Sequence, residues 1–559
     1  MNVPAKEADS RVASIQSIRS PTIASEKHIN RAGQRPQDYF FSNQAIQTHQ
    51  TTPTITLSKL VSMTLTLAAV FWLAIQAAQV GALAIRDPVV NWASLASSRG
   101  DHLPDFSYCG YDNSDSAIPT IGTADIVLTA PTKPTDDIAP ALQQAINTVW
   151  GNGGGVVRIP AGKFYMLAGI QLYSNVIVTG TGNRGTTLVL KRKPTKPVFT
   201  LGRFGIAPKA DFGYRSRITN TYVAVGAETV TVKDASGFVV GQNVYIARAV
   251  TDAWVRANGM ADLASNGSPV EWISTGTQIM APNVIKTISG NTITFKVPIT
   301  DNLSSTYMRA EVRAYTPPQP TSEMGIANLN IETGGDTCSG TRLDYTTCNY
   351  AAVRFASWTV DSWASGLNLT GFNKFFEVQR DASKITIQDN IMNRDKDITG
   401  DTLPSDIMLR GHQVLIQDNT QVGLDSARSY SVSTDGFTPG PNTITRYTTE
   451  SGDQQLAPYT RWSWGMLVEG SSAPTKLGNR GTTGQGWAMN AGVGWNLRTD
   501  VEFQSPPLGI NWCIGCGNPG DSNGNATLIQ SGNQVKPKSL FAAQLKARGV
   551  TWYDRGADN

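Results

Sequence analysis

The sequence predicts an all-β protein folded as a parallel β-solenoid. After residue 120, short runs of β-forming residues alternate with Gly, Asn, Asp and Thr, and helical periodicity is scarce. The tetrapeptide Ile-Gln-Asp-Asn occurs at 387–390 and again at 416–419, as expected of successive coils of one solenoid. With 40% hydrophobic and 16% charged residues, the 559-residue chain is too apolar for a disordered protein.

The chain divides into five segments by composition. We expect a disordered polar leader, a signal peptide or transmembrane anchor, the first part of the solenoid, a β-rich insertion, and the second part of the solenoid with long loops. These segments are residues 1–58, 59–84, 85–215, 216–315 and 316–559, respectively.

The segment from Leu60 to Ile85 contains no charged residue. It is long enough to span a bilayer, which would make the chain a single-pass type II membrane protein. Its apolar core and the closing Gly81-Ala82-Leu83-Ala84 favour a cleaved signal peptide, and therefore secretion. Four glycosylation sequons agree with a secretory route; they begin at Asn266, Asn302, Asn368 and Asn525.

The five cysteines are too few for a disulfide scaffold. Cys338 and Cys348 flank a Gly- and Thr-rich loop, and we expect them to pair in an oxidising compartment. Cys513 and Cys516 form a C-x-x-C motif with no second motif and no nearby histidine, which favours a structural disulfide over a zinc site. Cys109 is then left over.

Residues 138–149 are the clearest helix of the sequence. Apolar residues recur there at helical spacing, and Thr135-Asp136-Asp137 supplies an N-cap and negative charge at the helix start. We expect this helix to cap the open N-terminal end of the solenoid, where an uncovered edge invites aggregation. Glycines 153–155 end the helix, and short strands follow.

This region resembles the N-terminal signature of pectate-lyase-like proteins. The matching residues are Asp136-Asp137, Ala145-Ile146, Gly153–Gly155, Ile159–Gly162, Gly180 and Gly182. That superfamily consists of right-handed parallel β-helix polysaccharide lyases and glycoside hydrolases. The resemblance covers about sixty residues and implies the fold more strongly than the reaction.

Later motifs are similar to one subgroup of that superfamily, whose activity is unknown to us. They include residues 103–111, 361–363, 440–442, 461–462 and 479–481. The subgroup tends to carry histidines in its later motifs, where this chain has Arg428-Ser429-Tyr430 and Thr460-Arg461-Trp462 instead. This departure puts a histidine-dependent mechanism in doubt.

Between the two parts of the solenoid, residues 216–315 alternate apolar and polar positions around glycine-containing turns. This pattern predicts a small antiparallel β insertion. Its loop-like middle, with Trp254 and Trp272, can overhang a groove.

Tryptophan, arginine and asparagine are crowded into the C-terminal part of the chain. Sugar rings stack on aromatic faces, and their hydroxyls need polar partners, so this mixture suits a saccharide cleft. Packing under long loops is the alternative explanation. The predicted substrate-binding residues are Trp462, Trp487, Asn479, Arg480, Trp495 and Asn496.

For β-elimination of a uronate polymer, arginines must neutralise the substrate carboxylate and a base must remove a proton. Arg428, Arg461 and Arg480 are predicted for the first task, because a guanidinium matches a carboxylate. The predicted bases are Tyr430, Tyr459 and His412.

Two alternatives stay open: a glycoside hydrolase on the same scaffold, and a polysaccharide-binding surface protein that has lost catalysis. Carboxylates available for hydrolysis are Asp406, Asp425, Asp435 and Glu469. The expected partner is a polysaccharide and not a nucleic acid, because the net charge is only +4 and no basic run occurs. No metal site or cofactor is expected; calcium is compatible with the sequence but not indicated.

Overall fold

The computed structural model of the chain describes a single compact unit within residues 85–559. The described ranges are 87–133, 135–182, 185–191, 196–205, 208–334, 342–344, 350–399, 403–450, 453–517 and 526–556. The predicted leader, the signal or anchor segment, and the predicted Cys338–Cys348 pair lie outside these ranges.

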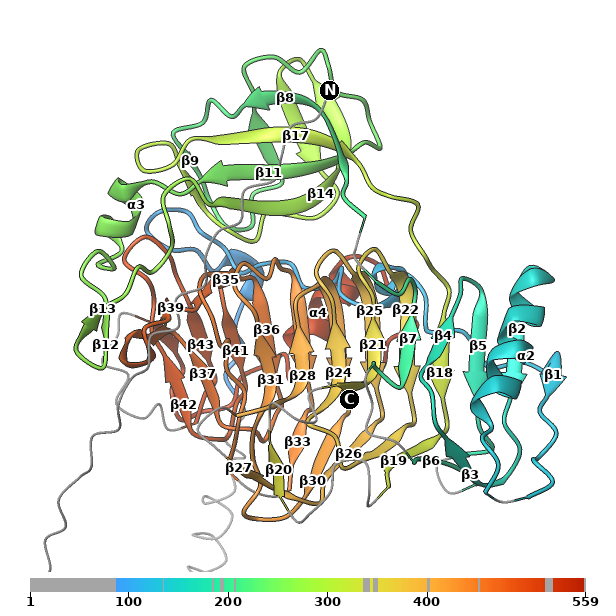
Figure 1. The fold of residues 1–559 in the computed structure, drawn as a ribbon. Helices are drawn as coiled ribbons and strands as arrows, with labels where there is room; N and C mark the ends of the chain where they lie inside the picture. The colour runs from blue at the N-terminus through green and yellow to red at the C-terminus, as the bar shows by residue number, and fades with distance from the viewer. Residues whose placement is uncertain are drawn as a thin grey trace, which may run out of the picture. The chain divides into compact units, whose positions relative to one another are not determined.

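Three parallel sheets run along this unit (Figure 1). The first consists of β1 (Ile126–Val127), β2 (Gly155–Arg158), β5 (Val176–Thr179), β18 (Gly325–Ala327), β22 (Val360–Ser365), β25 (Ser383–Gln388), β29 (His412–Gln417), β32 (Asn442–Thr445), β36 (Met466–Glu469), β41 (Val493–Trp495), β43 (Trp512–Ile514) and β44 (Thr527–Ile529).

The second sheet consists of β3 (Gly162–Met166), β6 (Thr186–Leu190), β19 (Asn330–Thr333), β23 (Asn368–Thr370), β26 (Ile391–Arg394), β30 (Thr420–Gly423) and β33 (Thr448–Thr449). The third consists of β4 (Ile170–Leu172), β7 (Phe199–Leu201), β21 (Ala351–Phe355), β24 (Lys374–Val378), β28 (Ser405–Leu409), β31 (Arg428–Thr434) and β34 (Asp453–Gln455). The chain visits the three sheets in turn and pairs each strand with its counterpart one coil away. The predicted parallel β-helix is therefore confirmed.

Side chains stack in register inside the coils. One buried ladder joins Val178, Ile326, Ala364, Ile387, Ile416, Ile444 and Val468. At the turns, Asn390 donates to the side-chain oxygen of Asn419 at 2.9 Å, and Gln417 donates to Gln388 at 2.8 Å. The Ile-Gln-Asp-Asn repeat therefore joins neighbouring coils through both apolar and amide ladders.

Helix α2 (Ala139–Gly151) covers the N-terminal coil, as predicted. Leu142, Ile146 and Val149 are buried in the core of the β-helix. Of the three residues expected to supply the N-cap, Asp137 does so: its carboxylate accepts the hydrogen bond of the Ala139 amide at 3.0 Å.

The insertion is an antiparallel sheet with strand order β10-β15-β14-β11-β17-β8, seen in green above the coils in Figure 1. Its strands are β8 (Asp211–Arg217), β10 (Thr229–Thr231), β11 (Asn243–Ala249), β14 (Gln278–Ser289), β15 (Thr292–Phe295) and β17 (Ala310–Thr316). The predicted antiparallel insertion is confirmed, and it encloses an apolar core of its own.

Smaller elements complete the described fold. Within the insertion they are α3 (Asp252–Ala257) and the pairs β9 (Tyr222–Val223) with β16 (Leu303–Ser304) and β12 (Ala264–Ser265) with β13 (Ser268–Pro269). On the coils they are the pairs β20 (Arg342–Asp344) with β27 (Asp397–Thr399), β35 (Ser463–Trp464) with β40 (Met489–Asn490), β37 (Thr475–Leu477) with β42 (Val501–Phe503), and β38 (Asn479–Arg480) with β39 (Gly486–Trp487). The short 3₁₀ turns are η1 (Trp92–Ser94), η2 (Tyr111–Ser114) and η3 (Gly481–Thr483).

Both ends of the described chain cover the outer face of the first sheet. Leu103 and Phe106, before the first strand, and Leu540 and Phe541, in α4 (Leu540–Ala547), share one apolar cluster with that face. The residues that they cover are Leu415, Leu467, Val493, Trp495, Trp512 and Ile514. This covering protects an apolar face that would otherwise be open to solvent.

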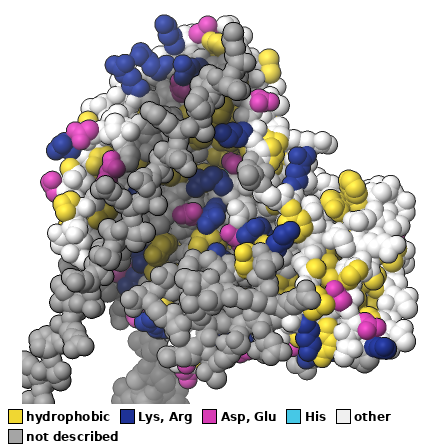
Figure 2. Space-filling model, viewed as in Figure 1, with side chains coloured by type: hydrophobic (Ala, Val, Ile, Leu, Met, Phe, Trp, Pro, Cys, Tyr) yellow, Lys and Arg dark blue, Asp and Glu magenta, His cyan; other side chains and the backbone are white. Residues whose placement is uncertain are grey.

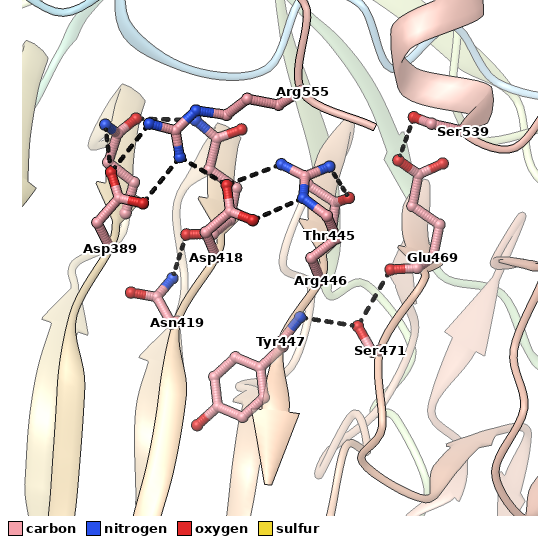
Figure 3. A network of polar contacts seen from close by, with 12 residues as sticks. Asp389, Asp418, Asn419, Thr445, Arg446, Tyr447, Glu469, Ser471, Ser539 and Arg555 are labelled. Carbon is pink, nitrogen blue, oxygen red and sulfur yellow. Dashed lines mark hydrogen bonds and ion pairs between the residues drawn. The ribbon is translucent and has the colours of Figure 1, made fainter. Parts of the chain in front are cut away.

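A polar network fastens the C-terminal end (Figure 3). Arg555 pairs with Asp389 at 2.8 Å and with Asp418 at 2.6 Å, and Arg446 pairs with Asp418 at 2.6 Å. Burial alone would raise the pKa of Asp418. The hydrogen bonds and positive charges of the Arg446 and Arg555 guanidinium groups have a larger effect, so the pKa of Asp418 is lowered. The carboxylates of Asp389 and Asp418, on neighbouring coils, are thus neutralised by Arg446 and Arg555.

Cys513 and Cys516 form the predicted disulfide. Cys109 is a buried free thiol, and burial raises its pKa. None of the helices in the described part of the chain has the length and apolar composition that a bilayer span requires.

Glu469 caps helix α4, and its removal should loosen the C-terminal end. Its buried carboxylate accepts hydrogen bonds from the Ser539 hydroxyl at 2.6 Å and from the amides of Leu540 at 2.7 Å and Phe541 at 3.2 Å. Glu469→Ala leaves these donors unpaired, so we expect a loss of about 2–3 kcal/mol in local stability. Hydrogen exchange of the α4 amides measures it.

The matched control is Glu502→Ala, which removes an exposed glutamate paired with Lys476 at 3.3 Å. An exposed pair of this kind contributes about 0–1 kcal/mol. If the α4 amides exchange equally slowly in both variants, Glu469 does not hold the helix.

Candidate functional site

Charged side chains of neighbouring coils meet on the face of the third sheet that points away from the core. Arg354 alternates with the core residues Val353 and Phe355, and its register partner on β24 is Glu377. Arg354 and Glu377 form an ion pair at 2.7 Å. The period-2 alternation of a strand explains why both point outward.

Arg410, directly after β28, joins this pair to the next coil. Its guanidinium lies 3.7 Å from the Glu377 carboxylate and 3.2 Å from that of Asp435, which follows β31. Glu377 is almost buried beneath these arginines, whereas Asp435 is partly exposed. Two carboxylates on different coils therefore share one guanidinium.

Lys374 lies at the start of β24 and is almost completely buried. Burial lowers its pKa, the nearby Glu377 charge raises it in part, and the positive charges of Arg410 and Arg354 lower it further. Lys374 is thus a third basic side chain close to Glu377, after Arg354 and Arg410.

A cluster of two tyrosines and one arginine lies on the following coils. The Arg480 guanidinium donates a hydrogen bond to the Tyr430 hydroxyl at 2.9 Å and lies 5.6 Å from the centre of the Tyr459 ring. The two tyrosine rings are 5.5 Å apart. Tyr430 is buried within β31, whereas Tyr459 is 36% exposed.

The charged group and the tyrosine cluster are continuous. The Thr460 hydroxyl donates to the Asp435 carboxylate at 3.3 Å, and Thr460 follows Tyr459 directly in the chain. We call the combined set the polar strip; it consists of Arg354, Lys374, Glu377, Arg410, Tyr430, Asp435, Tyr459 and Arg480.

The polar strip crosses β21, β24, β28 and β31, a distance of about 15 Å at the usual strand spacing. Its four cationic residues exceed its two carboxylates by two charges. A cavity of about 120 Å³ continues it at the Arg354 end, where Arg203, Phe204 and Gln379 join the lining. Figure 2 shows basic and acidic side chains interspersed on the face where the coils lie below the insertion.

Near the tyrosine cluster, several buried polar atoms have no hydrogen-bond partner among the described residues. They are Nε of Arg480, Oδ1 of Asn479 and Nε of Arg461. Buried polar atoms are nearly always paired in folded proteins.

The structure thus brings together Tyr430, Tyr459 and Arg480, with Asn479 and Arg461 next to them in the chain. Arg428 is exposed at the start of β31, two residues before Tyr430. Arg428 has no ion pair among the described residues, so no contact links it to the cluster, and its role in neutralising a substrate carboxylate stays a prediction.

Trp462 and Trp487 have a packing role instead of the predicted substrate-binding role. Both are buried in an apolar cluster with Trp254 and Trp272 of the insertion. The Trp462 ring lies 4.6 Å from that of Trp254, and the Trp487 indole donates to the Asn258 carbonyl at 2.9 Å. These side chains fix the insertion to the coils.

Trp495 and Asn496 are likewise structural, which corrects the prediction for them. Trp495 is fully buried and donates to the Pro537 carbonyl at 2.8 Å, and Asn496 donates to the Val535 carbonyl at 2.9 Å. Both side chains hold the segment that leads into α4.

His412 lies apart from the tyrosine cluster, in a cavity between the first sheet and the insertion. Burial and the charge of Lys384 lower its pKa to about 3, so the imidazole is neutral at ordinary pH. A base this weak is poorly matched to proton abstraction near neutral pH.

The carboxylates considered for hydrolysis are dispersed. Asp406 is fully buried and pairs with Arg394 at 2.6 Å, and Glu469 caps α4. Asp425 is exposed in a loop, and only Asp435 belongs to the polar strip. Within the described ranges, no group of three or more His, Cys, Asp or Glu side chains is placed to hold a metal ion.

The sequence analysis missed Arg354, Lys374, Glu377 and Arg410. A signal exists for Lys374 and Glu377, which enclose Phe375-Phe376 in an otherwise apolar strand. A charged residue in a strand that is otherwise apolar is expected to pair with an opposite charge, because an unpaired buried charge is costly.

No protein-family model and no curated protein matches the chain. Similar solved structures include the Gp54 tailspike of Acinetobacter baumannii bacteriophage AP22 in complex with a capsular saccharide. It is 12% identical, and the match covers 72% of this chain and 70% of the other with a TM-score of 0.23. A tailspike double mutant of E. coli bacteriophage HK620 in complex with a pentasaccharide is 11% identical, over 69% of this chain and 54% of the other, with a TM-score of 0.33. The A-module of the Azotobacter vinelandii mannuronan C-5 epimerase AlgE6 is 9% identical, over 73% of this chain and 98% of the other, with a TM-score of 0.27. Likenesses this weak carry no argument about activity.

His412 should make the fold acid-sensitive. The unfolded chain takes up the imidazole proton below pH 6.5, whereas the folded chain does so only near pH 3. Acidification from pH 6.5 toward 4 therefore removes stability, by up to about 1.4 kcal/mol per pH unit. In His412→Gln, thermal melting should fall less steeply over this interval than in the wild type.

The matched control is His102→Gln, which removes an exposed histidine and should keep the wild-type slope. Equal slopes for the wild type and His412→Gln would contradict the assignment of His412.

Proposed function

We propose that this protein binds an acidic, uronate-containing polysaccharide along the polar strip and cleaves it by β-elimination. The observation that carries the proposal is the 2.9 Å hydrogen bond from Arg480 to the Tyr430 hydroxyl, at one end of a strip with excess positive charge. The runs of short strands make the surface long and shallow, as an extended polymer requires.

In β-elimination, a base removes the proton from C5 of the uronate, the C4–oxygen bond breaks, the departing oxygen takes up a proton, and a C4–C5 double bond forms. Arg480 and Arg461 are assigned to the substrate carboxylate, which they neutralise so that the C5 proton becomes acidic. Tyr430 and Tyr459 are assigned to proton transfer. Because a guanidinium has only donors, the Tyr430 oxygen accepts from Arg480, and its own hydroxyl hydrogen points elsewhere.

Arg354 and Arg410, which are partly exposed, are assigned to binding, whereas Lys374 is buried. The two arginines lie two coils apart, about 10 Å at the usual strand spacing, so two uronate carboxylates can be contacted at once. Each exposed contact is weak and screened by salt, but several act together.

Two other functions remain as alternatives. Glu377 and Asp435 lie on either side of Arg410, and this pair of carboxylates favours hydrolysis as the second candidate. A binding protein without activity is the third, because the chain lacks the later histidines of the subgroup that it resembles.

Secretion and membership of the pectate-lyase-like superfamily belong to the same proposal. The Cys513–Cys516 disulfide supports an oxidising compartment. Of the sequons, Asn266 is exposed, whereas Asn302 is buried and donates to the Leu508 carbonyl at 2.9 Å. Glycosylation is therefore expected at Asn266 and not at Asn302.

Tyr430→Phe should abolish most of the lyase activity, because it removes one hydroxyl oxygen and keeps the ring. We expect a loss of 10²-fold or more, the usual contribution of acid–base catalysis. The assay incubates the full chain with polygalacturonate, alginate and hyaluronate, and follows both unsaturated-uronide absorbance and new reducing ends.

Tyr173→Phe is the matched control, since Tyr173 stacks on Trp150 at the capping helix and lies outside the polar strip. A lyase gives both signals, a hydrolase gives reducing ends alone, and a binding protein gives retention on the polymer with neither. Full lyase activity in Tyr430→Phe would exclude this tyrosine as the proton-transfer group.

A further inference from the structure

A second site lies between the insertion and the coils, separate from the polar strip. It is a cavity of about 310 Å³, which falls within the range of ligand-binding pockets. The insertion contributes Tyr245 and Tyr315, and the coils contribute Trp358, Asp381, Lys384 and His412. We call it the cleft.

Aromatic rings form one wall of the cleft. Tyr245 and Tyr315 are stacked with ring centroids 4.1 Å apart, and Trp358 lies 6.3 Å beyond Tyr315. The Trp358 indole donates to the Pro208 carbonyl at 2.9 Å, which fixes its ring. Aromatic faces suit the C–H faces of sugar rings; because Tyr245 covers one face of Tyr315, the other face of Tyr315 and the Trp358 ring are left for a ligand.

Polar groups stand beside this wall. The Tyr245 hydroxyl reaches the Asp381 carboxylate at 3.5 Å, and burial raises the pKa of that carboxyl. His412 is the register partner of Ser383 on the adjacent strand, and its pKa of about 3 keeps the imidazole neutral. A neutral imidazole offers one donor and one acceptor, which matches hydroxyl groups.

The charges of the cleft are balanced, unlike those of the polar strip. Lys384 lies 3.6 Å from Asp361, and Asp115 pairs with Arg548 at 3.0 Å. The two remaining charged residues of the lining, Lys296 and Asp381, are opposite in sign. A cavity without net charge gives no preference to an anionic ligand over a neutral one.

We propose that the cleft binds an uncharged saccharide, with its rings on Tyr315 and Trp358 and its hydroxyls on Asp381 and His412. This site is independent of the cleavage proposed for the polar strip. It gives the protein a second carbohydrate specificity that differs in charge from the first.

The test titrates the full chain with cellotriose, maltotriose and mannotriose, and with trigalacturonate as the acidic counterpart, by isothermal titration calorimetry. We expect at least one uncharged trisaccharide to bind. Trp358→Ala and Asp381→Asn should each weaken it tenfold or more, whereas Trp358→Phe should retain most of the affinity. Excess polygalacturonate, which occupies the polar strip, should not displace the ligand.

Trp150→Ala is the matched control, because it removes an exposed tryptophan of the capping helix. Circular dichroism and thermal melting verify that each variant is folded. The proposal is overturned if no uncharged trisaccharide binds at millimolar concentration, if Trp358→Ala binds as the wild type does, or if only trigalacturonate depends on Trp358. Loss of lyase activity in the polar strip leaves this result unaffected, so the two proposals fail separately.

Discussion

Each coil of this protein can bury its inner side chains only against the coils on either side. The ladder from Val178 to Val468 is the result, with every member paired in register to its neighbour. Register on the inside fixes register on the outside, because strand side chains alternate between faces. Arg354 and Glu377 meet on the outer face for this reason.

A stack of coils also has ends and an apolar outer face that must be covered. Helix α2 covers the first coil, and the segments around Phe106 and α4 cover the outer face of the first sheet. This covering explains why Trp495 and Trp512 occur near the C-terminus. The crowding of tryptophan that suggested a saccharide cleft reflects closure of the fold, together with the attachment of the insertion through Trp462.

Local patterns were sufficient to predict the coils, the capping helix and the insertion, because strand alternation, helical spacing and turn residues are each visible in a short stretch of sequence. Tyr430, Tyr459 and Arg480 were predicted as separate candidates, and the coils bring them together. Glu377 and Arg410 were missed because the turns from the third sheet to the first differ in length. These turns are residues 356–359, 379–382, 410–411 and 435–441, so outer-face neighbours cannot be counted from the sequence.

The insertion changes what this scaffold can bind. Coils alone present an open surface on which cations repeat at the strand spacing, and such a surface favours a linear polyanion through several weak contacts. The insertion adds Tyr245 and Tyr315 beside the coil residues Trp358 and Asp381, and together these residues line a cavity. Because a cavity wall replaces water on part of a ligand's surface, stacking and hydroxyl contacts suffice there without net charge. The regular coils and the irregular insertion therefore select for ligands by different physical means.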